Sequence, residues 1–527
     1  MTRTRGLRVI DRGGGMKTRL LRDIEVSEVG MGCMAFSHGY GQIPPEEYSV
    51  EAIRNAYRNG CTFFDTAEIY SPNLSGIGHN ERIVGKALYG VREQVVIATK
   101  LFLNGFEAVG RGSVSSVIPV DREGNHLCNA QMWEDKRTVS ICQEMEPYHR
   151  EIFQLCGSRV NPVFSGTKMK WFRRNRPDIY EKTWKFAVIP DYLFYHMTGN
   201  FCTDYTYGSR SLLMNLKTCS WDKRLLELME VDEEKLCELK APGSIMGYTT
   251  KKFAGETGIS EGLPVISAGG DQQCGMLGQG AVEYGDVSLT LGTGGFLLTT
   301  CREVPEYLDW DVVCNASSVT GEYILEASML TCTSAMEWFK RNFYREESDF
   351  YGRLNEILSD IPVGAHGCRA LPYFQGRSTP DWNSSAAAAF CNITLNTSRE
   401  DMLKALMESI CMEIRNNISS FEKYVPTDRI LINGGLSKSE SFNQMQADVY
   451  GKRVVRMDNE ESTAVGALMV AAVAMKEYRT MKEAFLTVRG GAKRKEYLTR
   501  EENHVIYEKL KEEMGEIYQK MKEFRKI

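Results

Sequence analysis

The sequence predicts a mixed α/β protein in which a short βα segment precedes a larger body of strands, Gly-rich turns and helices. Within residues 16–103, strand-like apolar runs alternate with amphipathic helical stretches, a pattern typical of parallel βα units. From residue 104 onward, buried strands, Gly-rich turns and helices recur over about four hundred residues. A length of 527 residues suggests about three or four domains, each large enough to bury its own core.

The composition excludes several classes of protein. The net charge of −5 and the pI near 6.0 give no reason to expect nucleic acid or an anionic membrane as a partner. The fifteen Cys residues include no CxxC pair, which favours a reduced protein over a disulfide framework. The longest apolar stretch, AVGALMVAAVAM from Ala464, is too short to span a bilayer. We therefore expect a cytoplasmic protein, with residues 1–15 as a disordered leader.

The segment from residue 16 contains three predicted strands and two predicted helices. The strands are VSEVGMGCM (26–34), CTFFDTAEIY (61–70) and QVVIATK (94–100). Between them, VEAIRNAYRNG (50–60) and NERIVGKALYG (80–90) have apolar residues at helical spacing. Three consecutive βα units are therefore expected.

Four motifs in this segment, GMGCM, FFDTAEIY, GHNERIVGKAL and VIATK, resemble the aldo-keto reductases, which are (β/α)8 barrels that use NADPH. The resemblance implies that Tyr70 is a general acid for a carbonyl oxygen. It also implies that Lys100, helped by Asp65, lowers the pKa of this phenol, which ordinarily lies near 10.

The reductase resemblance ends at about Phe102, and the following residues, LNGFEAVGRGSVSSVIPVD, supply no catalytic His. Three βα units cannot close an eight-stranded barrel. We interpret Asp65, Tyr70 and Lys100 as a reductase remnant that serves as scaffold. The segment is expected to form a separate three-unit layer or to lend a strand to the edge of the next lobe.

Two polar stretches precede the most informative region. VSSVIPVDREGNHLCNAQMWEDKRT (114–138) reads as a strand, a turn and a second strand that runs into a polar cluster. In FAVIPDYLFYHMTGNFCTDYTYGSRS (186–211), aromatic and small residues surround Asp191, Thr203, Asp204 and Ser209. These side chains fit either a helical core with a polar loop or the lining of a sugar pocket.

The stretch GLPVISAGGDQQCGMLGQGAV (262–282) places Asp271 between a buried strand and a helix. Ligands of α/β sheets bind at such carboxyl ends of strands, where a carboxylate can take a proton from a substrate hydroxyl. The alternative is a simple helix N-cap.

Two Gly-rich turns follow. VSLTLGTGGFLLTT (287–300) predicts two strands joined by Gly-Thr-Gly-Gly, whose backbone can present N–H groups to phosphate oxygens. RILINGGLSKSESFNQMQADVYGKRVVR (429–456) predicts a strand, a Gly-Gly turn and a helix with Ser437 near its start. This arrangement suits the α-phosphate and adenine end of a nucleotide. The small-residue helix ESTAVGALMVAAVA (461–474) is expected to pack against that turn.

Taken together with NAQMWEDKRT and LPYFQGRSTPDWN, these motifs resemble the FGGY carbohydrate kinases over about residues 104–515. That family includes xylulokinase, gluconokinase and glycerol kinase and has the actin-like (ribonuclease H-like) two-lobed ATPase fold. The resemblance implies transfer of the ATP γ-phosphate to a hydroxyl of a small, xylulose-like sugar or polyol, with Mg²⁺ neutralising charge. The residues that it implies are Asp271 as catalytic base, Gly292, Thr293, Gly294, Gly434, Gly435 and Ser437 at ATP, and Trp133, Asp135 and Arg137 at the sugar.

The chain departs from this family at its beginning. The kinases open with a hairpin that carries Asp-x-Gly-Thr, which holds Mg²⁺ and the transferring phosphate, and residues 1–103 contain no such hairpin. VIDRGGGMK (9–17) has an Asp and glycines without the strand pattern. The first lobe is therefore expected to be incomplete, and the metal ligands are unknown. Loss of the Asp-x-Gly-Thr hairpin is expected to slow phosphoryl transfer by several orders of magnitude.

The expected organisation is a reductase-like fragment at 16–103, kinase lobes at 104–262 and 263–490, and a C-terminal helix at 491–527. The leading hypothesis is an ATP-dependent sugar kinase. The alternatives are an NADPH-dependent reductase and a fused product with neither activity. We expect a small-molecule sugar as partner, and neither nucleic acid nor a membrane. Whether the protein forms a homodimer is left open.

Overall fold

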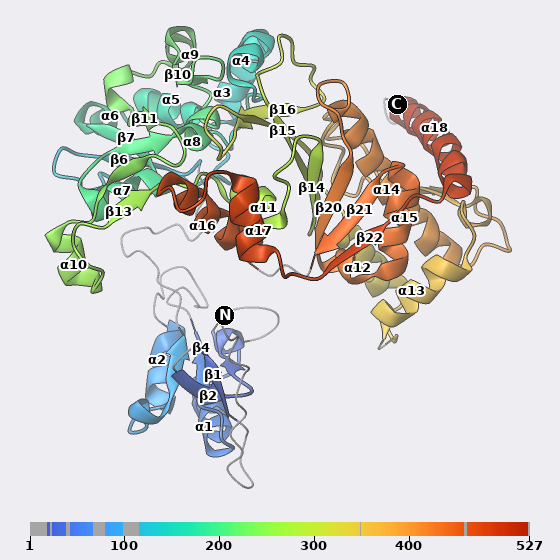
Figure 1. Ribbon diagram of the computed structural model, residues 1–527, viewed down its shortest axis with the longest axis horizontal. Helices are drawn as coiled ribbons and strands as arrows, with labels where there is room; N and C mark the ends of the chain where they lie inside the picture. The colour runs from blue at the N-terminus through green and yellow to red at the C-terminus, as the bar shows by residue number, and fades with distance from the viewer. Residues whose placement is uncertain are drawn as a thin grey trace. The chain divides into compact units, whose positions relative to one another are not determined.

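A computed structural model describes residues 18–21, 24–37, 43–66, 79–98, 115–347, 349–457 and 461–524 of the chain (Figure 1). The chain divides into two compact units. The smaller contains Met1–Arg111 with Cys128–Met132, and the larger contains Gly112–Leu127 with Trp133–Ile527. The expected leader at 1–15 lies outside the described residues.

The smaller unit is a three-stranded parallel sheet with two helices. Its elements are β1 (Thr18–Leu21), β2 (Ile24–Ser27), β3 (Met31–Gly32), α1 (Glu46–Arg58), β4 (Phe63–Asp65), α2 (His79–Ala87) and β5 (Val96–Ala98). Strands β3, β4 and β5 pair in parallel in that order, as the alternation of strands and helices predicts. Ile53, Phe64 and Ile83 form the centre of the core, each at most 2 % exposed.

Three parallel strands and two helices of the expected three-unit βα layer are present among the described residues. The described strands of this unit do not close a barrel. The antiparallel hairpin β1–β2, which precedes the sheet, was not expected from the sequence.

The first half of the larger unit contains short strand pairs among helices. Strand β6 (Val117–Val120) pairs antiparallel with β7 (Lys185–Val188), β8 (Cys202–Asp204) pairs parallel with β11 (Glu238–Lys240), and β12 (Ile245–Tyr248) pairs antiparallel with β13 (Pro264–Ile266). The other elements are α3 (Val139–Glu144), α4 (His149–Cys156), α5 (Ser165–Asn175), α6 (Pro177–Lys182), α7 (Ile189–Thr198), α8 (Tyr205–Ser209), β9 (Met214–Asn215), β10 (Ser220–Trp221), α9 (Lys223–Met229), α10 (Lys251–Thr257) and α11 (Asp271–Gln279).

The second half is organised around one seven-stranded sheet with the order β16-β17-β15-β14-β20-β21-β22. Its strands are β14 (Asp286–Leu291), β15 (Gly295–Cys301), β16 (Val313–Ala316), β17 (Tyr323–Met329), β20 (Arg429–Gly434), β21 (Arg453–Met457) and β22 (Arg494–Tyr497). The remaining elements are α12 (Thr333–Phe343), α13 (Phe350–Asp360), β18 (Arg369–Leu371), β19 (Ala389–Cys391), α14 (Arg399–Phe421), α15 (Glu440–Tyr450), α16 (Ser462–Ala474), α17 (Met481–Arg489) and α18 (Glu501–Phe524).

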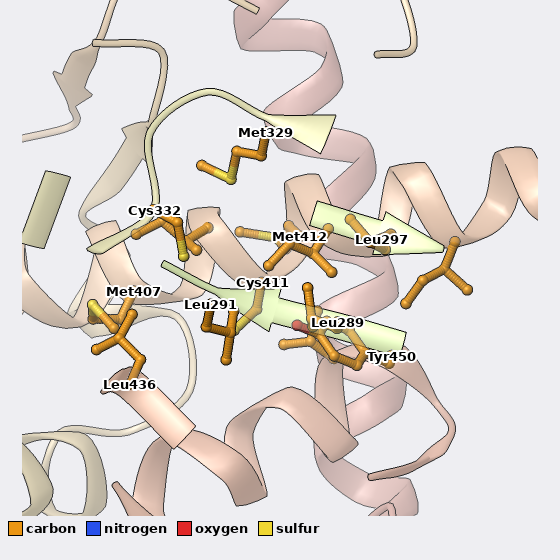
Figure 2. Packing of buried hydrophobic residues seen from close by; sticks show 14 of the residues in the cluster. Leu289, Leu291, Leu297, Met329, Cys332, Met407, Cys411, Met412, Leu436 and Tyr450 are labelled. Atoms are coloured by element: carbon orange, nitrogen blue, oxygen red, sulfur yellow. The ribbon is translucent and has the colours of Figure 1, made fainter. Parts of the chain in front are cut away.

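Helices cover both faces of this sheet because side chains alternate along each strand. On β20, Ile430 and Ile432 point into the core formed with α14 and α15, whereas Leu431 belongs to the core with α11, α16 and α17. Figure 2 shows part of the first core, in which Leu289 and Leu291 of β14 lie near the sulfur-containing side chains of α14.

The C-terminal region differs in part from the prediction of a helix over 491–527. The helix α18 occupies 501–524 and packs its buried Tyr507, Leu510, Met514 and Tyr518 against the second half of the unit. Residues 494–497 instead form the edge strand β22, paired antiparallel with β21. The short run RKEY forms a strand there because β21 offers an unpaired edge, which a one-sequence periodicity does not reveal.

Within the described parts of the chain, none of the helices is long and apolar enough to cross a membrane.

Candidate functional site

Two Gly-rich turns lie side by side at the carboxyl ends of neighbouring strands. Strands β14 and β20 are parallel, and their register pairs Leu291 with Gly434. The Gly-Thr-Gly-Gly turn after β14 and the Gly-Gly turn after β20 are therefore adjacent, although about 140 residues separate them in the sequence. The predicted hairpin is confirmed, since β14 and β15 pair antiparallel up to Leu291 and Gly295.

Glycine is required at both turns by close backbone contacts. A Cβ atom on Gly434, whose φ is +98°, would lie 2.3 Å from the carbonyl oxygen of Leu291. A Cβ atom on Gly294 would lie 2.5 Å from the carbonyl oxygen of Met329. Gly435, in contrast, has no atom within 4 Å of its Cβ position. The turns thus pack tightly against neighbouring backbone at Gly294 and Gly434, whereas the space beside Gly435 is open.

The start of α12 holds the Gly-Thr-Gly-Gly turn in place. The carbonyl oxygen of Thr293 accepts hydrogen bonds from the N–H of Cys332 (2.8 Å) and the hydroxyl of Ser334 (2.8 Å), and that of Gly292 accepts one from Thr333 N–H (3.0 Å). The side chain of Thr293 is exposed. Since its carbonyls are anchored, the turn has a fixed shape.

Ser437 closes the second turn from within. Its side chain is 5 % exposed, and its hydroxyl donates to the carbonyl oxygen of Gly434 at 2.7 Å. The helix α15 begins only at Glu440, where Ser439 is the N-cap and accepts from Phe442 N–H. Ser437 therefore lies in the short 3₁₀ turn at 435–438 that precedes the helix.

Asp271 is the first residue of α11, as the strand–helix pattern predicts. Gly270 is the N-cap, so the alternative that Asp271 is itself the N-cap is wrong. Its carboxylate is exposed and accepts a hydrogen bond from Gln272 N–H at 2.9 Å. A carboxylate in the first turn is stabilised by the helix dipole.

A buried polar network fixes the backbone immediately before Asp271. The hydroxyl of Thr206 accepts from Gly270 N–H at 3.0 Å and donates to Asp204 at 2.5 Å. Asp204 also accepts from Ser267 and caps α8, and Tyr207 donates to the carbonyl oxygen of Gly269 at 3.0 Å. Burial raises the pKa of Asp204 above its ordinary value, although the hydroxyl donors oppose this.

This network decides the role of the polar residues in 186–211. Asp191, Thr203, Asp204 and Ser209 are all at most 4 % exposed, so they are interior groups and not the lining of a pocket. Burial raises the pKa of Asp191 to about 8, and its Oδ1 has no hydrogen-bond partner in the described structure.

A cavity of about 330 Å³ opens at Asp271. Its volume suits a small ligand. The charged groups among the described lining residues are Asp271, Arg210 and Glu326, and the last two form an ion pair. Asp271 is consequently the carboxylate that is left to act on a bound molecule.

Strand β15 connects the lining of the cavity to the Gly-Thr-Gly-Gly turn along the chain. Phe296, Leu297 and Leu298 line the cavity and directly follow that turn in the chain. The first Gly-rich turn and part of the lining of the Asp271 cavity therefore belong to one continuous segment of the chain, 292–298.

Trp133, Asp135 and Arg137 are not among the described residues that line this cavity. Arg137 forms an ion pair with Asp135 at 2.6 Å and stacks 4.5 Å from the Trp171 ring centroid. Burial alone would raise the pKa of Asp135, but hydrogen bonds from Arg137 outweigh it and lower this pKa.

Of the reductase-like residues, Asp65 ends strand β4, where its backbone carbonyl accepts from Cys33 N–H at 2.8 Å. Tyr70 and Lys100 lie outside the described residues. The proposed reductase constellation is thus represented in the described structure by Asp65.

Several cavity residues were missed in the sequence analysis. Arg210, Glu326 and Trp382 come from separate parts of the chain, and Trp382 has a left-handed φ of 54°, unusual for its residue type. The segment LPYFQGRSTPDWN, which contains Trp382, had been noted only as a family motif. The sequence signal that could have identified Trp382 as a cavity residue was a Trp directly after Pro-Asp in a predicted loop.

The described residues fit ATP better than they define a metal site. The open backbone of the two adjacent Gly turns is suited to phosphate oxygens. No group of three or more His, Cys, Asp or Glu residues in the described ranges could hold a metal ion. Mg²⁺ commonly needs only one or two carboxylates together with nucleotide phosphates, so the described residues do not identify its ligands.

Comparison with known proteins agrees with this geometry. The N-terminal domain of the FGGY family of carbohydrate kinases matches residues 104–278, and the C-terminal domain matches 287–475. The first match includes Asp271, which the sequence analysis had assigned to the second lobe. The aldo/keto reductase family matches residues 28–122, so the two family matches overlap at 104–122.

The similarity to glycerol kinases extends over most of the length of both chains. The chain is 30 % identical over 420 residues to a glycerol kinase of Thermococcus onnurineus, covering 78 % of this chain and 84 % of that protein. A glycerol kinase of Thermococcus kodakarensis is 29 % identical over 422 residues, with 78 % and 83 % covered.

Solved structures show the same fold. The xylulose kinase of Rhodospirillum rubrum has a TM-score of 0.72 at 19 % identity, covering 86 % of this chain and 89 % of that one. The gluconate kinase of Lactobacillus acidophilus has a TM-score of 0.70 at 21 % identity, with 77 % and 84 % covered. The actin-like two-lobed fold is thereby confirmed, together with a partial reductase segment before it. The chain belongs to the FGGY family of carbohydrate kinases.

Proposed function

We propose that the protein transfers the γ-phosphate of ATP to a hydroxyl of a small sugar or polyol, with Asp271 as the general base. The observation that carries this proposal is the position of Asp271, in the first turn of α11 and at the opening of a cavity of about 330 Å³. A xylulose-like molecule is the substrate that we favour.

In the proposed step, the sugar hydroxyl oxygen attacks the γ-phosphorus of ATP while Asp271 takes the hydroxyl proton. A bond forms between that oxygen and phosphorus, and the bond from phosphorus to the β–γ bridging oxygen breaks, which releases ADP. Because the ion pair of Arg210 and Glu326 is internally neutralised, Asp271 supplies the free negative charge that accepts the proton.

We propose that Gly292, Thr293 and Gly294 contact the β- and γ-phosphates and that Gly434, Gly435 and Ser437 contact the rest of the nucleotide. The adjacency of the two turns supports this assignment. When bound with ATP, Mg²⁺ would neutralise triphosphate charge, and its ligands stay unassigned.

We retain Trp133, Asp135 and Arg137 as the proposed sugar contacts. Since they do not line the cavity in this conformation, their role requires the two lobes to close on the substrate. Closure would also exclude water and suppress ATP hydrolysis.

An ATP-dependent phosphorylation assay across pentuloses, hexonates and polyols tests the proposal. We expect ADP release that depends on one class of acceptor and is lost in Asp271→Ala. A complete absence of acceptor-dependent ADP release, with nucleotide binding unchanged in Asp271→Ala, would contradict it and favour a fused product without activity.

The family match at 28–122 is the observation that favours a second candidate, NADPH-dependent carbonyl reduction. It predicts NADPH binding and carbonyl turnover that is sensitive to Tyr70→Phe. Failure of the protein to bind NADPH would eliminate this candidate.

A further inference from the structure

Two arginines converge on one tryptophan beside the Asp271 cavity. The guanidinium carbons of Arg159 and Arg150 lie 4.2 Å and 5.0 Å from the ring centroid of Trp310. Arg159 also lies 4.8 Å from the ring centroid of Trp382, so two indoles contact it. Phe153 stacks on Trp310 at 5.0 Å.

Neither guanidinium has a counter-ion in the described structure. No carboxylate of the described residues lies within 4.0 Å of Arg150 or Arg159, and neither side chain makes a hydrogen bond to them. Two nearby carboxylates are already paired: Glu151, next to Arg150 in the chain, binds Arg224 at 2.8 Å, and Asp311, next to Trp310, binds Lys423 at 2.7 Å.

Arg159 has no carboxylate partner among the described residues. The partly buried Arg210 and Arg377 differ, because they pair with Glu326 and Glu413. Burial and the like charge of Arg150 both lower the pKa of Arg159. Placing two cations together without an anion costs free energy, and such a cost is offset when an anion binds between them.

The stacked geometry leaves the correct donors available. Contact with an indole face uses no N–H group in a conventional hydrogen bond, so the N–H groups of the guanidinium stay available as donors. An in-plane fork of N–H groups matches the two oxygens of a carboxylate or phosphate.

The location links the two arginines to the candidate active site. Trp382 lines the Asp271 cavity and donates its indole N–H to the carbonyl oxygen of Trp310 at 2.7 Å. Arg150 and Arg159 lie in the part matched by the N-terminal kinase domain, and both tryptophans lie in the part matched by the C-terminal domain. The cluster of two arginines and two tryptophans is therefore built from both halves of the larger unit.

We propose that Arg150 and Arg159 form a binding site for the oxyanion group of a small acid, a carboxylate or a phosphate. Two sources share this chemistry. One is a sugar acid whose other end occupies the Asp271 cavity, where the described cation, Arg210, is already paired with Glu326. The other is free phosphate or a phosphate monoester.

Isothermal titration of the full-length protein without nucleotide tests the site. Inorganic phosphate and gluconate are titrated separately, with sodium chloride at matched ionic strength as the ligand control. We expect saturable binding of phosphate or of gluconate. Binding of gluconate with weaker binding of phosphate identifies the sugar-acid source, and the reverse order identifies the phosphate source.

Variants locate the binding. Arg159→Met and Arg150→Met keep the aliphatic stem and remove the charge, and each should weaken binding by about 10-fold to 100-fold. Arg353→Met is the matched control, because Arg353 is an exposed arginine already paired with Glu356 at 2.7 Å.

The absence of saturable binding of both anions to the unmodified protein overturns the proposal without reference to any variant. Equal affinity in Arg159→Met, with the variant folded by circular dichroism, also overturns it. If Arg159→Met fails to fold, Arg159→Lys and the exposed Arg150→Met replace it, and unchanged binding in both refutes the site. Because the readout is binding without ATP, the result is independent of the proposed kinase activity.

Discussion

The contact between α11 and α16 determines where Asp271 lies, and one glycine tests it. A Cβ atom on Gly466 of α16 would lie 1.8 Å from the carbonyl oxygen of Cys274 in α11. An ordinary contact begins at 3.4 Å, so Gly466→Ala forces the helix backbones apart by the difference between 3.4 and 1.8 Å, about 1.6 Å. The clashing atom belongs to the backbone, and no side-chain rotation can relieve it.

Two consequences follow from this displacement. Overpacking of this kind costs about 1–3 kcal/mol of unfolding free energy. A misplacement of about 1 Å at a reacting group costs about 100-fold in rate, so kcat should fall by about that factor. Urea unfolding and steady-state kinetics measure the two effects.

The matched control is Gly275→Ala in α11, where a Cβ atom would meet only the Thr463 hydroxyl, at 3.4 Å. This change should be neutral or stabilising by up to about 1 kcal/mol, because Ala favours a helix over Gly. If Gly466→Ala is as stable and as active as Gly275→Ala, the packing of α11 on α16 is not what positions Asp271.

Two further predictions concern buried charges. The folded-state pKa of Asp191, raised by burial to about 8 from an ordinary 3.8, means that the folded protein keeps a proton which the unfolded chain releases. Stability should therefore fall as pH rises from about 4 to 8, and Asp191→Asn should flatten this slope in thermal unfolding at pH 5 and 8; an unchanged slope contradicts the assignment. Arg377 donates two hydrogen bonds to the buried Glu413. Arg377→Met should destabilise by about 3–5 kcal/mol in urea unfolding, and adding Glu413→Met should recover much of this, whereas additive losses would show that the pair is not coupled.

The sequence was sufficient to predict the Gly-rich turns and the helix that begins at Asp271. Each depends on a local sequence pattern. An apolar run followed by Gly-Thr-Gly-Gly, as at β14, is compatible with few structures other than a strand that ends in a tight turn. The adjacency of Gly292 and Gly434 was not readable from spacing, because it comes from the parallel pairing of β14 with β20.

Long-range packing explains one prediction that was wrong and one feature that was not predicted. The helix over 461–474 was expected on the Gly-Gly turn, but α16 packs on α11, because Gly278 and Gly466 allow the two helices to touch. In the described residues, a 3.4 Å hydrogen bond from Asn433, at the end of β20, to Ser462 links this helix to the turn. The ion pair of Arg210 with Glu326 joins residues 116 positions apart, and no local pattern predicts it.

The central claim is that Asp271 removes the proton from an acceptor hydroxyl during phosphoryl transfer. Asp271→Asn keeps the size and the first helical turn but cannot act as a base. With ATP, Mg²⁺ and the best acceptor from the substrate panel, we predict that kcat falls by about 100-fold to 10,000-fold. The Kd for ATP should stay within about 2-fold, because the Gly-rich turns are unchanged. An Asp271→Asn variant that phosphorylates the acceptor at the rate of the unmodified protein would contradict the claim.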